Sequence, residues 1–257
     1  MAELARVVAY LDALLQTADV PDYGGAVNGL QFANGGRVTK VAAAVDFSRA
    51  TVRGAIDAGA DLLLVHHGMF WGGAAPVVGA AYERVRDLVR HDVAVYASHL
   101  PLDRHPEVGN NVLLARELGL VPGGEFARYK GVAVGVTGDA DVGTAELVER
   151  ARTFARRHGG EVRTTPIDGG RRTRRWALCT GAGASSESLR EAVSLGADTV
   201  IVGEGPHHTA VDAAELGLAV LYCGHYATET LGVRAVAERV AGELGLGWTF
   251  VESPTGL

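Results

Sequence analysis

Short runs of apolar residues alternate with stretches of helical periodicity from one end of the chain to the other. The expected strands are 41–45, 62–65, 93–97, 132–136, 176–180, 199–202, 219–223 and 248–251. The expected helices are 49–59, 80–91, 109–118, 143–158, 186–195, 209–216 and 227–244. Continuous apolar strands followed by helices are typical of βαβ units, whose parallel sheet is covered on both faces. The sequence therefore predicts an α/β fold with mainly parallel sheets.

One pattern occurs twice in the chain. Residues 59–68 read GADLLLVHHG and residues 196–205 read GADTVIVGEG, with five identical positions. A second similarity follows on the next expected strand of each half, where a histidine precedes an acidic residue by four positions: His99 and Asp103, then His225 and Glu229. Two matches in the same order predict an internal duplication.

The duplication predicts two similar α/β half-domains, at residues 1–125 and 126–257. The stretch 121–130 is polar, rich in glycine and without periodicity, so we expect a linker there. Ligands of open α/β sheets bind outside the carboxyl ends of the strands. We therefore expect both half-domains to supply residues to one cleft between them.

Four imidazoles and two carboxylates lie at or just after these strand ends: His66, His67, His99, Asp103, His225 and Glu229. Neutral imidazole and carboxylate are the usual ligands of Zn, Fe, Mn, Ni and Co. Six such groups exceed what one tetrahedral ion needs, and they suit two divalent ions bridged by a carboxylate or a water. Glu204, His207 and His208 follow another strand end and are weaker candidates for the same cleft. His91, His105 and His158 have no counterpart in the repeat and are expected at the surface.

Composition limits the compartment and the partners. Only Cys179 and Cys223 are present, which is too few for a disulfide framework and fits a reducing cytoplasm. No apolar run approaches the ~20 residues of a membrane helix. The formal charge of −6 argues against a nucleic-acid surface. The arginine-rich run at 171–175 is expected to be a solvated face, with phosphate binding as the alternative.

One alternative to a metal-binding function is the binding of a dinucleotide. Gly181 and Gly183 follow an expected strand and open a helix, and Glu204 ends the next strand about 20 residues later. The position of the third glycine of that fingerprint is Ser186. A second alternative is a scaffold that holds metal ions without turnover, because the ligands alone look the same in both cases.

Five motifs in this order resemble the Nif-three-like family, whose members are often labelled GTP cyclohydrolase 1 type 2 homologues. They are VNGLQ at 27–31, VDFS at 45–48, DLLLVHHGMFW at 61–71, SHLPLD at 98–103 and GHYATE at 224–229. The resemblance runs from about residue 5 to 254 and identifies a short member without the extra domain that longer members carry between their halves.

The resemblance implies a dinuclear metal centre whose ligands are His66, His67, Asp103, His225 and Glu229, with Glu229 bridging. It places His99 beside the ions as a proton-transfer or supporting group. It also implies a homohexamer, and a hydrolase that opens the purine ring of GTP or acts on a related small molecule.

Overall fold

The computed structural model describes all 257 residues, which form two compact units. Unit 1 comprises Met1–Leu102 and Gly232–Ser253, and unit 2 comprises Asp103–Leu231 and Pro254–Leu257. These bounds differ from the expected halves at 1–125 and 126–257, because the last long helix and the strand after it belong to unit 1. None of the helices combines the length and the apolarity needed to cross a bilayer.

Unit 1 is built on a five-stranded sheet in the order β13-β4-β5-β6-β2. The strands of this sheet are β2 (Gly29–Phe32), β4 (Lys40–Asp46), β5 (Leu62–His67), β6 (Ala94–Ala97) and β13 (Gly247–Phe250). Two further strands, β1 (Ala2–Glu3) and β3 (Arg37–Val38), form a separate antiparallel pair. The helices of unit 1 are α1 (Leu4–Leu15), α2 (Arg49–Asp57), α3 (Gly79–His91) and α10 (Thr230–Leu244), and α4 (Leu100–Asp103) ends in the first residue of unit 2. The four strands β13, β4, β5 and β6 are parallel, and only the edge strand β2 is antiparallel.

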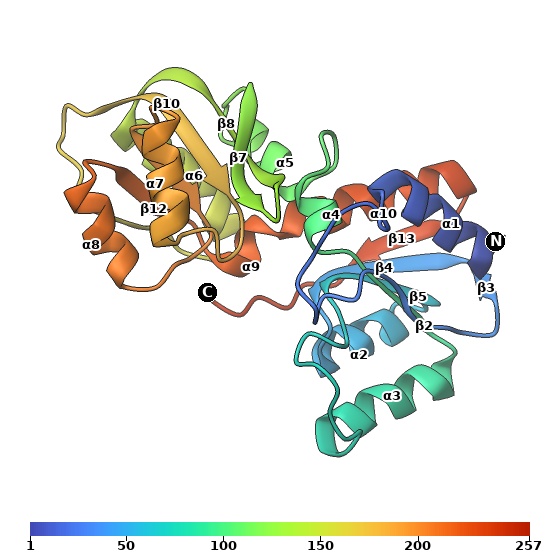
Figure 1. The fold of residues 1–257 in the computed structure, drawn as a ribbon. Coiled ribbons are helices and arrows are strands. Elements are labelled where there is room, and N and C mark those ends of the chain that lie inside the picture. Colours follow the sequence, from blue (N-terminus) through green and yellow to red (C-terminus); the bar gives the residue numbers. More distant parts are fainter. The chain divides into compact units, whose positions relative to one another are not determined.

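Helices cover both faces of this sheet, with α1 and α10 on one face and α2 and α3 on the other (Figure 1). The strand residues are accordingly apolar on both sides, as in the run Leu62–Val65, in which no side chain is more than 1% exposed. Two polar side chains then follow this run at the carboxyl end of β5, His66 and His67.

Unit 2 contains a six-stranded sheet in the order β7-β8-β10-β11-β12-β9. Its strands are β7 (Gly124–Tyr129), β8 (Val132–Gly143), β9 (Arg163–Thr164), β10 (Arg172–Cys179), β11 (Thr199–Val202) and β12 (Ala219–Tyr222). Its helices are α5 (Asn110–Glu117), α6 (Thr144–Arg157), α7 (Ser186–Ser194), α8 (His208–Glu215) and α9 (His225–Thr228). Successive residues of β10 face opposite sides, so that Trp176 packs with α5 and α6 while Ala177 packs with α7 and α8.

The α/β class is confirmed, but the strands of unit 2 are not mainly parallel. Only β10, β11 and β12 run parallel, and the other three strands are antiparallel to their neighbours. The linker expected at 121–130 is also absent, because Gly124–Tyr129 pairs with β8 as the edge strand β7. A short edge strand needs apolar residues on one face only, and here Phe126 alone is buried, so no periodic pattern marks it.

The repeated GAD segments form the same turn in both units. In each, the glycine has a positive φ, +66° at Gly59 and +76° at Gly196, and ends the preceding helix. The aspartate then receives backbone N–H groups at the start of the neighbouring parallel strand. The donors to Asp61 are Thr39 and Lys40, and the donors to Asp198 are Arg174 and Arg175. We call this arrangement the GAD turn.

Candidate metal centre

Three histidines of unit 1 lie together at the carboxyl ends of its strands. His66 and His67 end β5, and His99 follows β6. One ligand atom from each of the three lies within 4.8 Å of the other two, which is close enough for a shared metal ion. The sequence singled out all three, because the carboxyl ends of adjacent parallel strands meet at one edge of the sheet.

Each of these rings is oriented through Nδ1. The Nδ1–H of His66 donates to the Ser98 carbonyl (2.8 Å), that of His67 to Asp46 Oδ1 (2.8 Å) and that of His99 to Asp22 Oδ1 (2.9 Å). A carbonyl or carboxylate oxygen can only accept, so the proton is on Nδ1 and the lone pair is on Nε2. Metal-binding histidines characteristically have this outer partner.

In unit 2, a second group of ligand atoms surrounds Gly181, just beyond the end of β10. His225 Nε2 lies 3.2 Å from Glu229 Oε2, one turn further along the chain. The Nδ1–H of His225 donates to Glu204 Oε1 at 2.7 Å. This histidine therefore follows the same rule as the three in unit 1.

Asp103 belongs to the same neighbourhood of unit 2. Its Oδ1 accepts from Asn110 Nδ2 at 2.9 Å, and Thr180 Oγ1 lies 3.5 Å away. Burial, with the charges of Asp103 and Glu229, raises the pKa of the Cys179 thiol. Cys179 therefore stays protonated in the metal-free chain, and oxygen and nitrogen atoms are the donors that unit 2 offers to an ion.

The pKa of His225 is shifted by the acidic residues around it. Burial alone would lower its pKa, but the hydrogen bonds and negative charges of Glu229 and Glu204 outweigh that effect and raise the pKa to about 9. The metal-free protein therefore holds a proton at the position where a divalent cation would take its place.

This raised pKa predicts how the stability of the metal-free protein changes with pH. The folded chain binds the His225 proton more tightly than the unfolded chain, whose histidine keeps a pKa of about 6.5. The stabilisation is fully present below pH 6.5 and is lost as the pH rises through about 9. Urea unfolding of the chelated protein should show a lower midpoint at pH 9.5 than at pH 6.5. In a His225→Gln variant this fall should be smaller, and an equal fall in both proteins would contradict the assignment.

Close packing within unit 2 requires the glycines of the possible dinucleotide fingerprint. A Cβ on Gly183 would lie 2.2 Å from the Cys179 carbonyl oxygen, so the backbone can pass there only as glycine. A Cβ on Gly181, which has φ +60°, would lie 2.1 Å from Glu229 Oε1. The start of α7 is capped by Ser185 in a reciprocal pair with Ser188. The residues of this turn therefore all have structural roles that need no bound pyrophosphate.

The arginine-rich run lies at the wrong end of the sheet for a phosphate site next to Gly181. It starts β10, whereas Gly181 follows its carboxyl end more than about 20 Å away at 3.3 Å per residue. Three of the arginines bind oxygens of the chain: Arg171 those of Asp198 and Gly217, Arg172 that of Asp141, and Arg175 that of Asp139.

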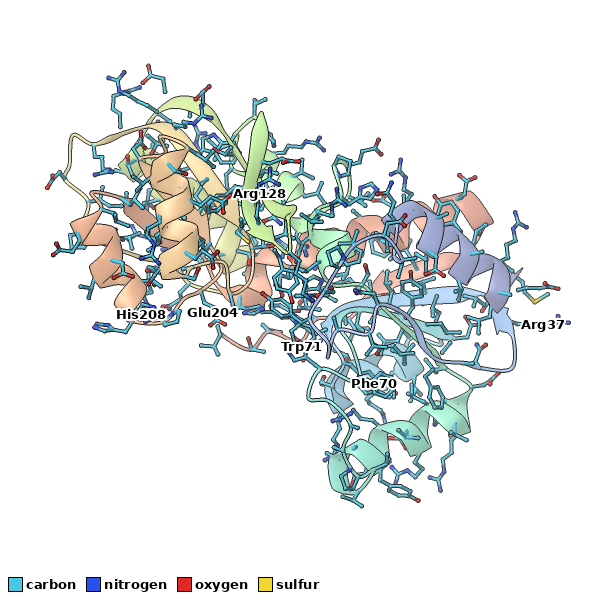
Figure 2. All side chains as sticks on the ribbon, in the orientation of Figure 1. Arg37, Phe70, Trp71, Arg128, Glu204 and His208 are labelled. Atoms are coloured by element: carbon cyan, nitrogen blue, oxygen red, sulfur yellow. The ribbon has the colours of Figure 1, made fainter.

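Glu204 is the one member of the weaker group of candidates that reaches the site. It lies in the loop between β11 and α8, and His208 begins α8; both residues are labelled in Figure 2. His207 and His208 are exposed. His91 is exposed as expected, whereas His105 and His158 are half-buried and make local hydrogen bonds.

Sequence reasoning missed Asp22, which organises the loop around His99. The carboxylate of Asp22 accepts from His99 Nδ1, from the Leu100 N–H (2.9 Å) and from Asn28 Nδ2 (2.8 Å). Burial raises its pKa, but the hydrogen bonds, foremost the one from His99, prevail and lower it. Asn28 of the VNGLQ motif also accepts from the His99 N–H at 2.7 Å. That motif is the only signal in the sequence for this loop.

Comparison of the sequence with known protein families identifies the family of this chain. The family described as Duf34/NIF3 (NGG1p interacting factor 3) matches residues 2–255. The chain belongs to the DUF34/NIF3 family.

Relatives match over nearly their whole length. A Halobacterium salinarum member, named GTP cyclohydrolase 1 type 2 homolog, is 42% identical over 257 residues, covering 99% of this chain and 100% of that protein. The protein of the same name from Deinococcus radiodurans is 39% identical over 254 residues, covering 98% and 94%. The solved structure of protein ybgI, described as of unknown function, has a TM-score of 0.89, 33% identity and coverage of 100% of both chains. The fold of this DUF34/NIF3 member is thus that of a solved structure.

Proposed function

We propose that this chain is a metal-dependent hydrolase that holds two divalent ions through His66, His67, Asp103, His225 and Glu229, with Glu229 bridging. The observation that carries the proposal is that all four candidate imidazoles donate from Nδ1 to an oxygen, which leaves Nε2 as the ring atom available to an ion. In His225 the ion would replace the Nε2 proton. Metal-ligating histidines almost always donate their other ring N–H to an oxygen in this way, which fixes the tautomer and the orientation of the ring.

The donor set fits divalent ions of the Zn, Mn, Fe, Ni or Co type, since it contains imidazoles and carboxylates and no thiolate. Two such ions, when bound, supply Lewis acidity and lower the pKa of water toward neutrality. Asp22 holds His99 in one tautomer through Nδ1, so that His99 can accept a proton at Nε2 during hydrolysis and return it to the leaving group.

The substrate class we propose is a purine nucleotide, with GTP as the first to test, because relatives carry the name GTP cyclohydrolase 1 type 2 homolog. A first water would add to the imidazole carbon of the purine and open the ring to a formamide, and a second water would hydrolyse that formamide to an amine and formate. We further propose a cytoplasmic homohexamer, which light scattering at several protein concentrations would test.

The experiment that tests the function starts with protein purified without a metal-affinity tag. Elemental analysis should find about two divalent ions per chain, and the loaded protein should release formate from GTP. Full loading without hydrolysis of nucleotides, phosphoesters or amides would replace the enzyme by a non-catalytic metal scaffold. A chain that stays empty after reconstitution with Zn, Mn or Fe would overturn the proposal.

A further inference from the structure

Two aromatic side chains of unit 1 stand against the histidines. The Trp71 ring centroid lies 4.6 Å from that of His99, edge-on at 71°, and 5.2 Å from that of His67. Tyr23 lies 5.9 Å from His99 and 6.4 Å from Trp71. We call Tyr23 and Trp71 the aromatic wall. Trp71 belongs to the loop after β5, as Figure 2 shows.

The wall is exposed although it lies next to buried groups. Tyr23 is 51% and Trp71 43% exposed, whereas His66 and His99 are at most 8% exposed. Aromatic rings that serve only packing are largely buried, because each ring contributes a large apolar area. Exposed rings beside a group of candidate metal ligands indicate a surface that a ligand covers.

The chain holds the two loops of the wall in place with Gln31. Its Oε1 accepts from the Met69 N–H at 2.6 Å, and its Nε2 donates to the Val27 carbonyl at 2.8 Å. Backbone packing tightens the same junction, because a Cβ on Gly25 would lie 2.6 Å from the Trp71 carbonyl oxygen. The loops that carry Tyr23 and Trp71 are thus tied to each other, and the wall is arranged before any ligand arrives.

A pocket of about 570 Å³ continues from these two loops. Its lining is mostly apolar and includes Phe47, Met69 and Phe70, with the Arg84 guanidinium 5.2 Å from the centre of the Phe47 ring. A cavity of this volume is within the usual range for small-molecule sites. Its chemistry suits a flat, weakly polar ring better than a phosphate, since Arg84 is its single basic side chain.

We propose that the aromatic wall stacks on a planar heteroaromatic ring of the substrate and holds that ring beside the histidines. The inference deepens the proposed function, on which it rests for the presence of a small-molecule substrate. It assigns ring recognition to unit 1 alone. Stacking on aromatic side chains tolerates different bases because every base has a π-face, so the wall selects for a flat ring and not for one particular base.

The test is equilibrium binding, which does not require turnover. The probes are guanosine monophosphate, a pterin and nicotinamide mononucleotide, with ribose 5-phosphate as the ring-free control. At least one ring-bearing probe should bind the wild type, and Trp71→Leu should weaken that binding about tenfold. Trp71→Phe should restore it to within about twofold, because the aromatic face is kept. Trp248→Leu, which removes a similarly exposed tryptophan from β13, should leave affinity unchanged.

Each outcome of this binding experiment either supports or overturns the proposed stacking on the aromatic wall. Equal affinity in the wild type and Trp71→Leu overturns the proposal, as does the failure of every ring-bearing probe to bind. A change of oligomeric state in Trp71→Leu, without a change in ring affinity, would make the wall a contact between copies and would also overturn it. Metal content measured in the same samples keeps the two proposals apart, since ring binding that depends on Trp71 stands even where no hydrolysis is found.

Discussion

Glu229→Gln should reduce the metal content from about two divalent ions per chain to fewer than one. The amide keeps the size of the side chain but removes the negative charge that a bridging ligand shares between two ions. Glu229 is 2% exposed, so no water-rich surroundings compensate for the lost charge. Loss of an outer partner of a ligand already costs roughly 10–100-fold in metal affinity, and loss of the ligand itself should cost more. Elemental analysis after gel filtration measures the change.

The matched control is Glu238→Gln, the same substitution at an exposed position of α10. It should keep the full metal content and any formate release. Circular dichroism and thermal unfolding of the chelated proteins should show that Glu229→Gln still folds. If Glu229→Gln binds as much metal as the wild type, Glu229 is not a bridging ligand.

Gly181→Ala should remove metal as effectively while changing no ligand at all. A Cβ at this position would lie 2.1 Å from Glu229 Oε1 and 3.3 Å from His225 Nε2. The carboxylate is the end of a flexible side chain and can move away, so the chain should fold but lose the ligand geometry. The φ of +60° adds backbone strain of about 1 kcal/mol. Metal content and the thermal midpoint of the chelated protein separate the two effects.

Gly217→Ala provides the control for backbone strain. Gly217 has φ +69°, close to that of Gly181, but a Cβ there would meet no atom within 4 Å. Both variants should lose similar stability when metal-free, and only Gly181→Ala should lose metal. Full metal content in Gly181→Ala would mean that Glu229 does not need the position it occupies here.

The sequence was sufficient to predict the strands and helices that have two apolar faces or a strong helical period. Expected strand 199–202 matches β11 to the residue, and 62–65 lies within β5. β2 and β7 were missed because edge strands bury little, and so they lack the continuous apolar runs of central strands. The strand at 132–136 was predicted and lies within β8, but its antiparallel direction was not, since an apolar run carries no information about strand direction.

The grouping of His66, His67 and His99 could be predicted because these residues lie at the carboxyl ends of adjacent parallel strands. The partners Asp22 and Asp46 could not be predicted, because they reach the histidines through folding across long sequence separations. A carboxylate in a loop looks the same in the sequence whether it faces water or an imidazole. Tyr23 is another case, since nothing in its local sequence links it to Trp71.

The shared spacing of His99 to Asp103 and of His225 to Glu229 is less regular in the structure than the repeated GAD segment. Ala94 pairs with Leu62, and Ala219 pairs with Thr199, the equivalent position in the repeated segment. Counted from these pairs, His225 lies one residue further along than His99. The additional residue falls between Ala219 and His225, in a segment that ends in Gly224, whose φ of +92° favours glycine. The histidines are therefore similar in spacing to their acidic partners but not equivalent in strand register.

The GAD turns separate the residues that hold the strands together from the candidate functional residues. Asp61 and Asp198 hold neighbouring strands at their amino ends, whereas His67 ends β5 and Glu204 follows the carboxyl end of β11. Neighbouring strands are thus held together at their amino ends, and the candidate functional residues lie at their carboxyl ends. In the repeated segment, His66 and His67 of the first copy stand where the second copy has Gly203 and Glu204, although the aspartate contacts are the same in both. The two units therefore share the contacts that hold their strands and differ in the side chains at the carboxyl ends of those strands.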